Sequence, residues 1–89
     1  MRNTFVNLSA SGVVIGGEGT ISGMYVNSTS SGTVKLYNHA SAASGSVIFN
    51  TITPAIGYHN LGDIRCSVGC YAQMGGTSRD ITFIVREAD

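Results

Sequence analysis

The chain has 89 residues, which is room for one domain spanning residues 1–89, and its five basic and five acidic residues cancel to a net charge of zero. No cluster of Lys or Arg supplies the long-range attraction that nucleic-acid binding needs, so we expect no nucleic-acid partner. No apolar run approaches the roughly 18 residues of a membrane-spanning helix, so we expect no membrane partner either.

From the amino terminus onward, short runs rich in β-branched and aromatic residues alternate with turns of Gly, Ser and Asn. This spacing is typical of an all-β sandwich or barrel, and helices have almost no place to start. We predict about eight short strands. They are Thr4 to Leu8, Gly12 to Ile15, Thr20 to Asn27, Thr33 to His39, Ser46 to Thr53, Tyr58 to Gly62, Ile64 to Met74 and Asp80 to Arg86.

Alternation of apolar and polar residues is clearest near the carboxyl end. Ile81, Phe83 and Val85 are predicted to face the core, which leaves Ile84 facing outward as an apolar side chain. The same parity turns Tyr37 outward in an earlier strand. Because a long apolar strand at an open edge invites aggregation, residues 81–85 should pair centrally or against another subunit.

Glycine and serine mark the expected irregularities. Apolar parity slips by one residue around Gly23, which predicts a β-bulge there. The turn-rich stretch from Asn27 to Thr33, with Gly32 available for positive φ, predicts a hairpin loop. Residues 40–45 are expected to form one mobile loop.

Eight short strands in one small domain predict a small antiparallel β-sandwich of jelly-roll or Greek-key type, with a small barrel as the alternative. A core of this size gives modest stability, and disulfides, a metal or oligomerisation are the usual reinforcements. Only 11% of the residues are charged, against about 25% in typical soluble domains. Low charge and a small core together favour self-association.

The two cysteines, Cys66 and Cys70, fall inside the strand predicted for residues 64–74. On an extended strand they would lie roughly 13 Å apart, too far for a disulfide, so we expect small buried thiols in a chain that folds in a reducing cytoplasm. His39 and His59 are isolated from other ligands. We therefore predict no metal and no cofactor.

Catalytic motifs are missing from the sequence. The glycine-rich stretch at residues 12–20 lacks the spacing and the lysine of a phosphate-binding loop, and no GxSxG elbow occurs. The five carboxylate residues of the chain are scattered along the sequence. We therefore do not expect an enzyme.

Three segments resemble small bacteriophage virion proteins, and the resemblance spans roughly residues 19 to 85. The segments are GMYVNSTSSGTVKLY at residues 23–37, TITPAIG at residues 51–57 and GGTSRDITFIV at residues 75–85. The resemblance implies a compact β-sandwich that is synthesised in the host cytoplasm and placed on the outer capsid surface of the virion. It further implies a head decoration, or cement, protein that binds the major capsid protein, stabilises the head and often forms a homotrimer.

Outward-facing parity and loop position select the candidate interface residues of such a protein. They are Tyr37, Arg79, Asp80 and Ile84. The alternative function is a phage tail or fibre module that binds host-surface carbohydrate through exposed aromatic side chains. Its candidates are Tyr25, Tyr37, Tyr58 and Tyr71.

Overall fold

The computed structural model describes the backbone of residues 2–87, together with their side chains except at positions 2–3, 29–31, 77–79 and 87. Its regular elements are antiparallel strands. They are β1 (Arg2–Leu8), β2 (Gly12–Ile15), β3 (Gly19–Asn38), β4 (Ser46–Ile52), β5 (Gly57–Cys66) and β6 (Cys70–Glu87). Across the described residues, no helix is long and apolar enough to cross a membrane.

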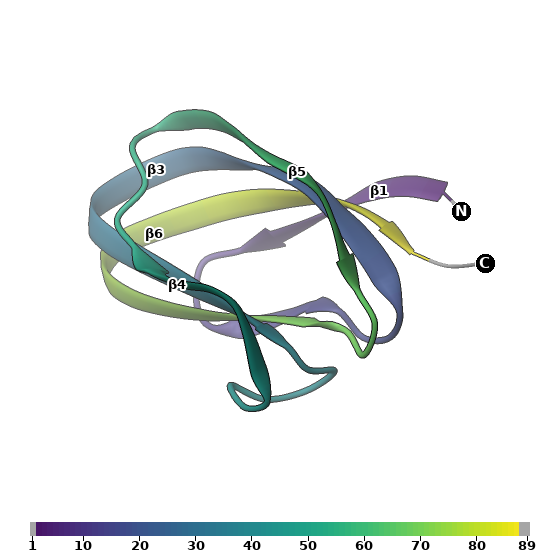
Figure 1. Ribbon diagram of the computed structural model, residues 1–89. Helices are drawn as coiled ribbons and strands as arrows, with labels where there is room; N and C mark the ends of the chain where they lie inside the picture. Colours follow the sequence, from purple (N-terminus) through teal and green to yellow (C-terminus); the bar gives the residue numbers. More distant parts are fainter. Residues whose placement is uncertain (1, 88–89) are drawn as a thin grey trace.

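Strands β3 and β6 are the long elements of the fold, and they pair along their whole length. The ladder runs from Gly19 opposite Glu87 to Tyr37 opposite Tyr71. Between Val26 and Thr33 the register shifts three times, and such bulges bend a strand. Figure 1 shows the consequence, because both strands curve round so that each belongs to two layers.

Each layer combines one half of the long pair with two shorter strands. The first layer contains β1, the second half of β6, the first half of β3 and β5. The second layer contains β2, the first half of β6, the second half of β3 and β4. Counted as segments, this makes eight antiparallel strands in two layers. The strand order is that of a jelly roll, which confirms the predicted sandwich.

The core lies between the two layers and follows the predicted alternation. Ile81, Phe83 and Val85 are buried, as are Val34 and Leu36 on the other long strand. Strand β6 lies between β1 and β3, so its apolar run is central in the sheet, as we expected. Further buried side chains come from both layers. They include Ile15, Ile21, Met24, Val26, Ala72 and Met74.

The bulge predicted at Gly23 is confirmed. Ile21 pairs with Val85 and Gly23 pairs with Ile84, so two steps along β3 match one step along β6. The hydroxyl of the extra residue, Ser22, donates a hydrogen bond to the carbonyl oxygen of Ile84 at 3.1 Å. The bulge therefore keeps Ile21, Met24 and Val26 on the buried face despite the slip in parity.

The hairpin predicted at residues 27–33 is wrong. The segment continues β3, with Ser28 opposite Asp80 and Thr33 opposite Gly75 in the ladder with β6. Residues 20–27 and 33–39 thus do not pair with each other, and each pairs with β6 instead. Gly, Ser and Asn permit a bulged bend as readily as a tight turn, so the local composition did not distinguish the two.

The strand predicted for residues 64–74 is also wrong. Strand β5 ends at Cys66, a turn occupies residues 67–69, and β6 begins at Cys70. Both cysteines are buried and free, as predicted, but they are not spaced along one extended strand. The spacing of an extended strand therefore does not keep the two cysteines apart.

Candidate functional site

Apolar side chains gather on the outer face of the first layer, which faces away from the core. Phe5 pairs with Ile84, and Ile84 pairs with Gly23. Two residues further along β3, Tyr25 lies opposite Tyr58. Phe5 is 69% exposed, Tyr58 52% and Tyr25 48%, while Ile84 is half-buried. We call Phe5, Tyr25, Tyr58 and Ile84 the aromatic face.

Gly23 gives the aromatic face its shape. A Cβ atom at this position would lie 2.5 Å from the Tyr58 hydroxyl oxygen, so the ring of Tyr58 occupies the space that a side chain would fill. The ring of Tyr25 stands beside it, with 6.4 Å between the centroids and a tilt of 45°. Tilted aromatic pairs at this separation attract each other. The two tyrosines therefore form one fixed platform.

A polar ladder adjoins the platform on the same face. The side-chain amide of Asn7 donates hydrogen bonds to Asp80 Oδ1 at 2.7 Å and to Thr82 Oγ1 at 3.0 Å. The amide of Asn27 donates to the same two atoms, at 3.4 and 3.0 Å. Because both N–H bonds of each amide are used, the orientation of both asparagine side chains is fixed. We call these four residues the asparagine ladder.

Two of the four predicted interface residues lie on this face. Ile84 belongs to the aromatic face, and Asp80 accepts the hydrogen bonds of the asparagine ladder. Tyr37 lies on the outer face of the second layer instead, opposite Tyr71. The side chain of Arg79 is outside the described residues. The structure thus brings Asp80 and Ile84 to one surface and places Tyr37 on another.

Tyr37 is part of a separate polar cluster. Its hydroxyl donates a hydrogen bond to Gln73 Oε1 at 3.2 Å, and the ammonium group of Lys35 lies 5.1 Å from the centroid of its ring. Cation–π attraction and the hydrogen bond together hold the ring half-buried on the sheet. The four tyrosines therefore divide into two pairs, with Tyr25 and Tyr58 on one layer and Tyr37 and Tyr71 on the other.

Phe5 is the most exposed residue of the aromatic face, and the sequence analysis did not select it. The sequence did contain a signal for it, because Phe5 alternates with the apolar residues Val6 and Leu8. In the structure, both of these are less exposed than Phe5. Parity alone would have placed Phe5 outward. Its position beside Ile84 depends on the pairing of β1 with β6, which no local pattern indicates.

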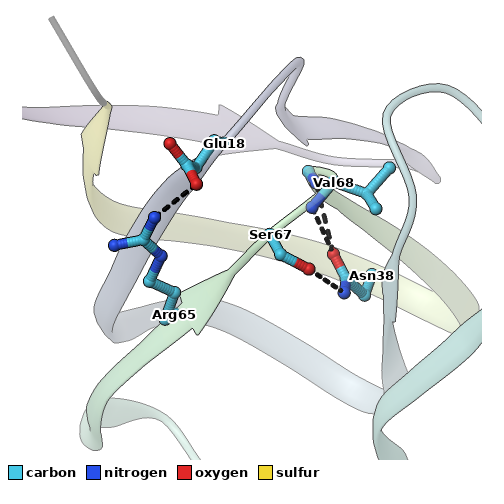
Figure 2. A network of polar contacts seen from close by, with 6 residues as sticks. Glu18, Asn38, Arg65, Ser67 and Val68 are labelled. Carbon is cyan, nitrogen blue, oxygen red and sulfur yellow. Dashed lines mark hydrogen bonds and ion pairs between the residues drawn. The ribbon is translucent and has the colours of Figure 1, made fainter.

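A second group of polar contacts fixes the turn between β5 and β6 (Figure 2). Asn38, at the end of β3, accepts hydrogen bonds at Oδ1 from the backbone N–H of Val68 at 2.9 Å and of Gly69 at 3.3 Å. Its Nδ2 donates to Ser67 Oγ at 3.1 Å. Nearby, exposed Arg65 and Glu18 form an ion pair that joins β5 to the chain before β3.

Each histidine side chain contacts backbone groups of residues close to it in the chain. His39 Nδ1 accepts hydrogen bonds from the backbone N–H of Ser41 and Ala42, at 3.1 and 3.0 Å, and His59 Nε2 lies 2.8 Å from the carbonyl oxygen of Ala55. Over the described part of the chain, no three His, Cys, Asp or Glu side chains gather as a metal ion would require. What the described residues present to a partner is the apolar surface of the aromatic face and the hydrogen-bonding groups of the asparagine ladder.

Comparison of the chain with models of protein families, with curated proteins and with solved structures found no match.

Proposed function

We propose that this chain is a non-catalytic structural protein of a bacteriophage virion, a decoration protein that attaches to the outer capsid lattice and stabilises the head. The observation that carries the proposal is the aromatic face, an exposed apolar surface built on four hydrogen-bonded strands. The resemblance to phage virion proteins and the low charge of 11% support the same role. A protein that reinforces a shell works through matched contacts and needs no reactive group.

The size of the molecule is compatible with stable attachment. A standard protein interface buries about 800 Å² on each partner. The described molecule exposes 4469 Å², so one such contact would use roughly a fifth of its surface. Phe5 and Tyr58 are of the residue types that dominate the energy of interfaces, and a sheet presents them with little loss of conformational freedom.

Co-sedimentation tests the attachment. Heads are purified from a phage that lacks the gene, mixed with the protein and pelleted. Phe5→Ser should weaken binding about tenfold or more, because a buried Phe side chain contributes about 1.5–3 kcal/mol. Val47→Ser, on the exposed outer side of the second layer, is the matched control and should bind as the unaltered chain does. Heads that pellet without any bound protein would remove the capsid role.

Self-association is the second element of the proposal, with a trimer expected at local threefold positions of the lattice. Sedimentation equilibrium at high micromolar concentration measures it in the absence of heads. A species of three chains that dissociates on dilution would support it. A strict monomer, both in solution and in a reconstruction of the decorated head, would contradict it.

Carbohydrate binding by a tail or fibre module is the second candidate, and one specific arrangement favours it. The tyrosine platform of Tyr25 and Tyr58 adjoins the asparagine ladder, so apolar ring faces lie beside amide, hydroxyl and carboxylate groups. Sugars present the matching combination of C–H faces and hydroxyl groups. A glycan array distinguishes the two functions, since hits that vanish in Tyr25→Ala but persist in Tyr37→Ala would favour the fibre module.

A further inference from the structure

The turn between β5 and β6 has the two cysteines of the chain at its two ends. Cys66 is the last residue of β5 and pairs with Gly19, while Cys70 is the first residue of β6 and pairs with Ile15. Only residues 67–69 separate the strand ends. Both side chains are completely buried in the shared core between the layers.

Both thiols belong to the same cluster of buried core residues, and both are free. A hydrogen bond from the Cys70 thiol lowers the pKa of Cys66, against the opposing effect of burial. The same contact, together with burial and the charge on Cys66, raises the pKa of Cys70. Of the two thiols, Cys66 is the one whose pKa is lowered, and its Sγ also donates a hydrogen bond to the carbonyl oxygen of Ile64 at 3.9 Å.

The surroundings hold this arrangement firmly. Asn38 binds the turn through the backbone N–H groups of Val68 and Gly69. Gly69 is so closely packed that a Cβ atom there would lie 2.8 Å from the carbonyl oxygen of Ile15 and 2.9 Å from Cα of Ala40. The turn therefore has little freedom to move the two sulfur atoms apart.

We propose that Cys66 and Cys70 are a disulfide-forming pair, which closes into an intramolecular bridge when the protein meets a low-molecular-weight disulfide such as oxidised glutathione. The Cys66 thiolate attacks one sulfur of the oxidant, forms a mixed disulfide and releases one glutathione thiolate. The released glutathione thiolate takes the proton of Cys70, whose sulfur then attacks the Cys66 sulfur and releases the second glutathione as a thiolate. Two protein thiols lose two electrons and two protons, and one glutathione disulfide becomes two glutathione thiols.

Burial decides how fast this reaction proceeds. Because neither sulfur is exposed, the oxidant reaches Cys66 only when the turn opens locally. The hydrogen bonds of Asn38 oppose that opening. The reaction should therefore be slow in the unaltered protein and several-fold faster in Asn38→Ala. Asn50→Ala, an exposed asparagine on β4, is the matched control and should leave the rate unchanged.

The test is incubation of the folded chain and of Asn38→Ala with oxidised glutathione, followed by acid quenching, alkylation and intact-mass measurement. We expect a monomeric product that has lost two hydrogens and carries no alkyl group. Cys70→Ser should instead stop at the glutathione adduct of Cys66. The proposal is overturned if free thiols, glutathione adducts or disulfide-linked dimers remain the product in both the unaltered protein and Asn38→Ala. The readout does not depend on capsid or glycan binding.

Discussion

Removing the side chain of Asn38 is the sharpest test of how the second layer is joined to the turn at residues 67–69. In Asn38→Ala, the backbone N–H groups of Val68 and Gly69 lose their shared acceptor, and Ser67 loses a donor. Each of these contacts joins segments about 30 residues apart in the chain. Their loss should therefore lower the free energy of unfolding of the whole domain.

The size of the loss in free energy of unfolding depends on how exposed the three partners of Asn38 are, namely Ser67, Val68 and Gly69. Ser67 and Val68 are exposed, so water replaces their lost partner at small cost, whereas Gly69 is buried and its N–H is left unsatisfied. A buried donor without a partner costs about 1–3 kcal/mol, which sets the expected loss for Asn38→Ala at about 2 kcal/mol. In a domain of this size that corresponds to a fall in Tm of roughly 10 °C.

Asn38→Asp distinguishes the contribution of the accepting oxygen of Asn38 from that of its donating amide nitrogen. Aspartate keeps an oxygen facing Val68 and Gly69 and loses only the hydrogen bond to Ser67, so it should cost no more than about 0.5–1 kcal/mol. Urea unfolding followed by tyrosine fluorescence measures both variants. A loss below about 0.5 kcal/mol in Asn38→Ala, or equal losses in the two variants, would refute the assignment.

Three further substitutions probe the core, the aromatic face and the surface. Phe83→Ala empties a completely buried site and should cost about 3–5 kcal/mol in urea unfolding, so a cost under about 2 kcal/mol would contradict the described core. Gly23→Ala should push the ring of Tyr58 off the sheet and cost about 1–3 kcal/mol, with a changed tyrosine NMR spectrum, and unaltered ring shifts would count against the contact. Glu18→Gln breaks the exposed pair with Arg65 and should change stability by less than about 0.5 kcal/mol, a limit that a larger measured change would disprove.

The outward-facing residues show how far sequence reasoning reached toward the candidate site. Parity placed Ile84 and Tyr37 on the outside of the sheet, and both do face outward. Parity says nothing about which outward residues are neighbours. Phe5, Ile84 and Gly23 come from three different strands, and only the register of β6 with β1 and β3 makes them adjacent.

The two errors along the chain have a common physical origin. Residues 27–33 were predicted as a turn and are a bend within a strand, while residues 67–69 were predicted as strand and are a turn. Local composition indicates which backbone conformations cost little free energy, and Gly and Ser allow several of them at low cost. The partner strand then selects among them, because each backbone N–H and C=O that is buried must find a hydrogen bond.

Local sequence patterns were enough to predict the all-β class, the bulge at Gly23 and the inward face of residues 81–85, because a period of two is a property of each strand alone. Only the tertiary structure shows that β3 and β6 run unbroken through both layers and that Tyr58 lies over Gly23. These are relations between segments far apart in the chain. They follow from how the two layers share one core, which depends on the pairing of all the strands together.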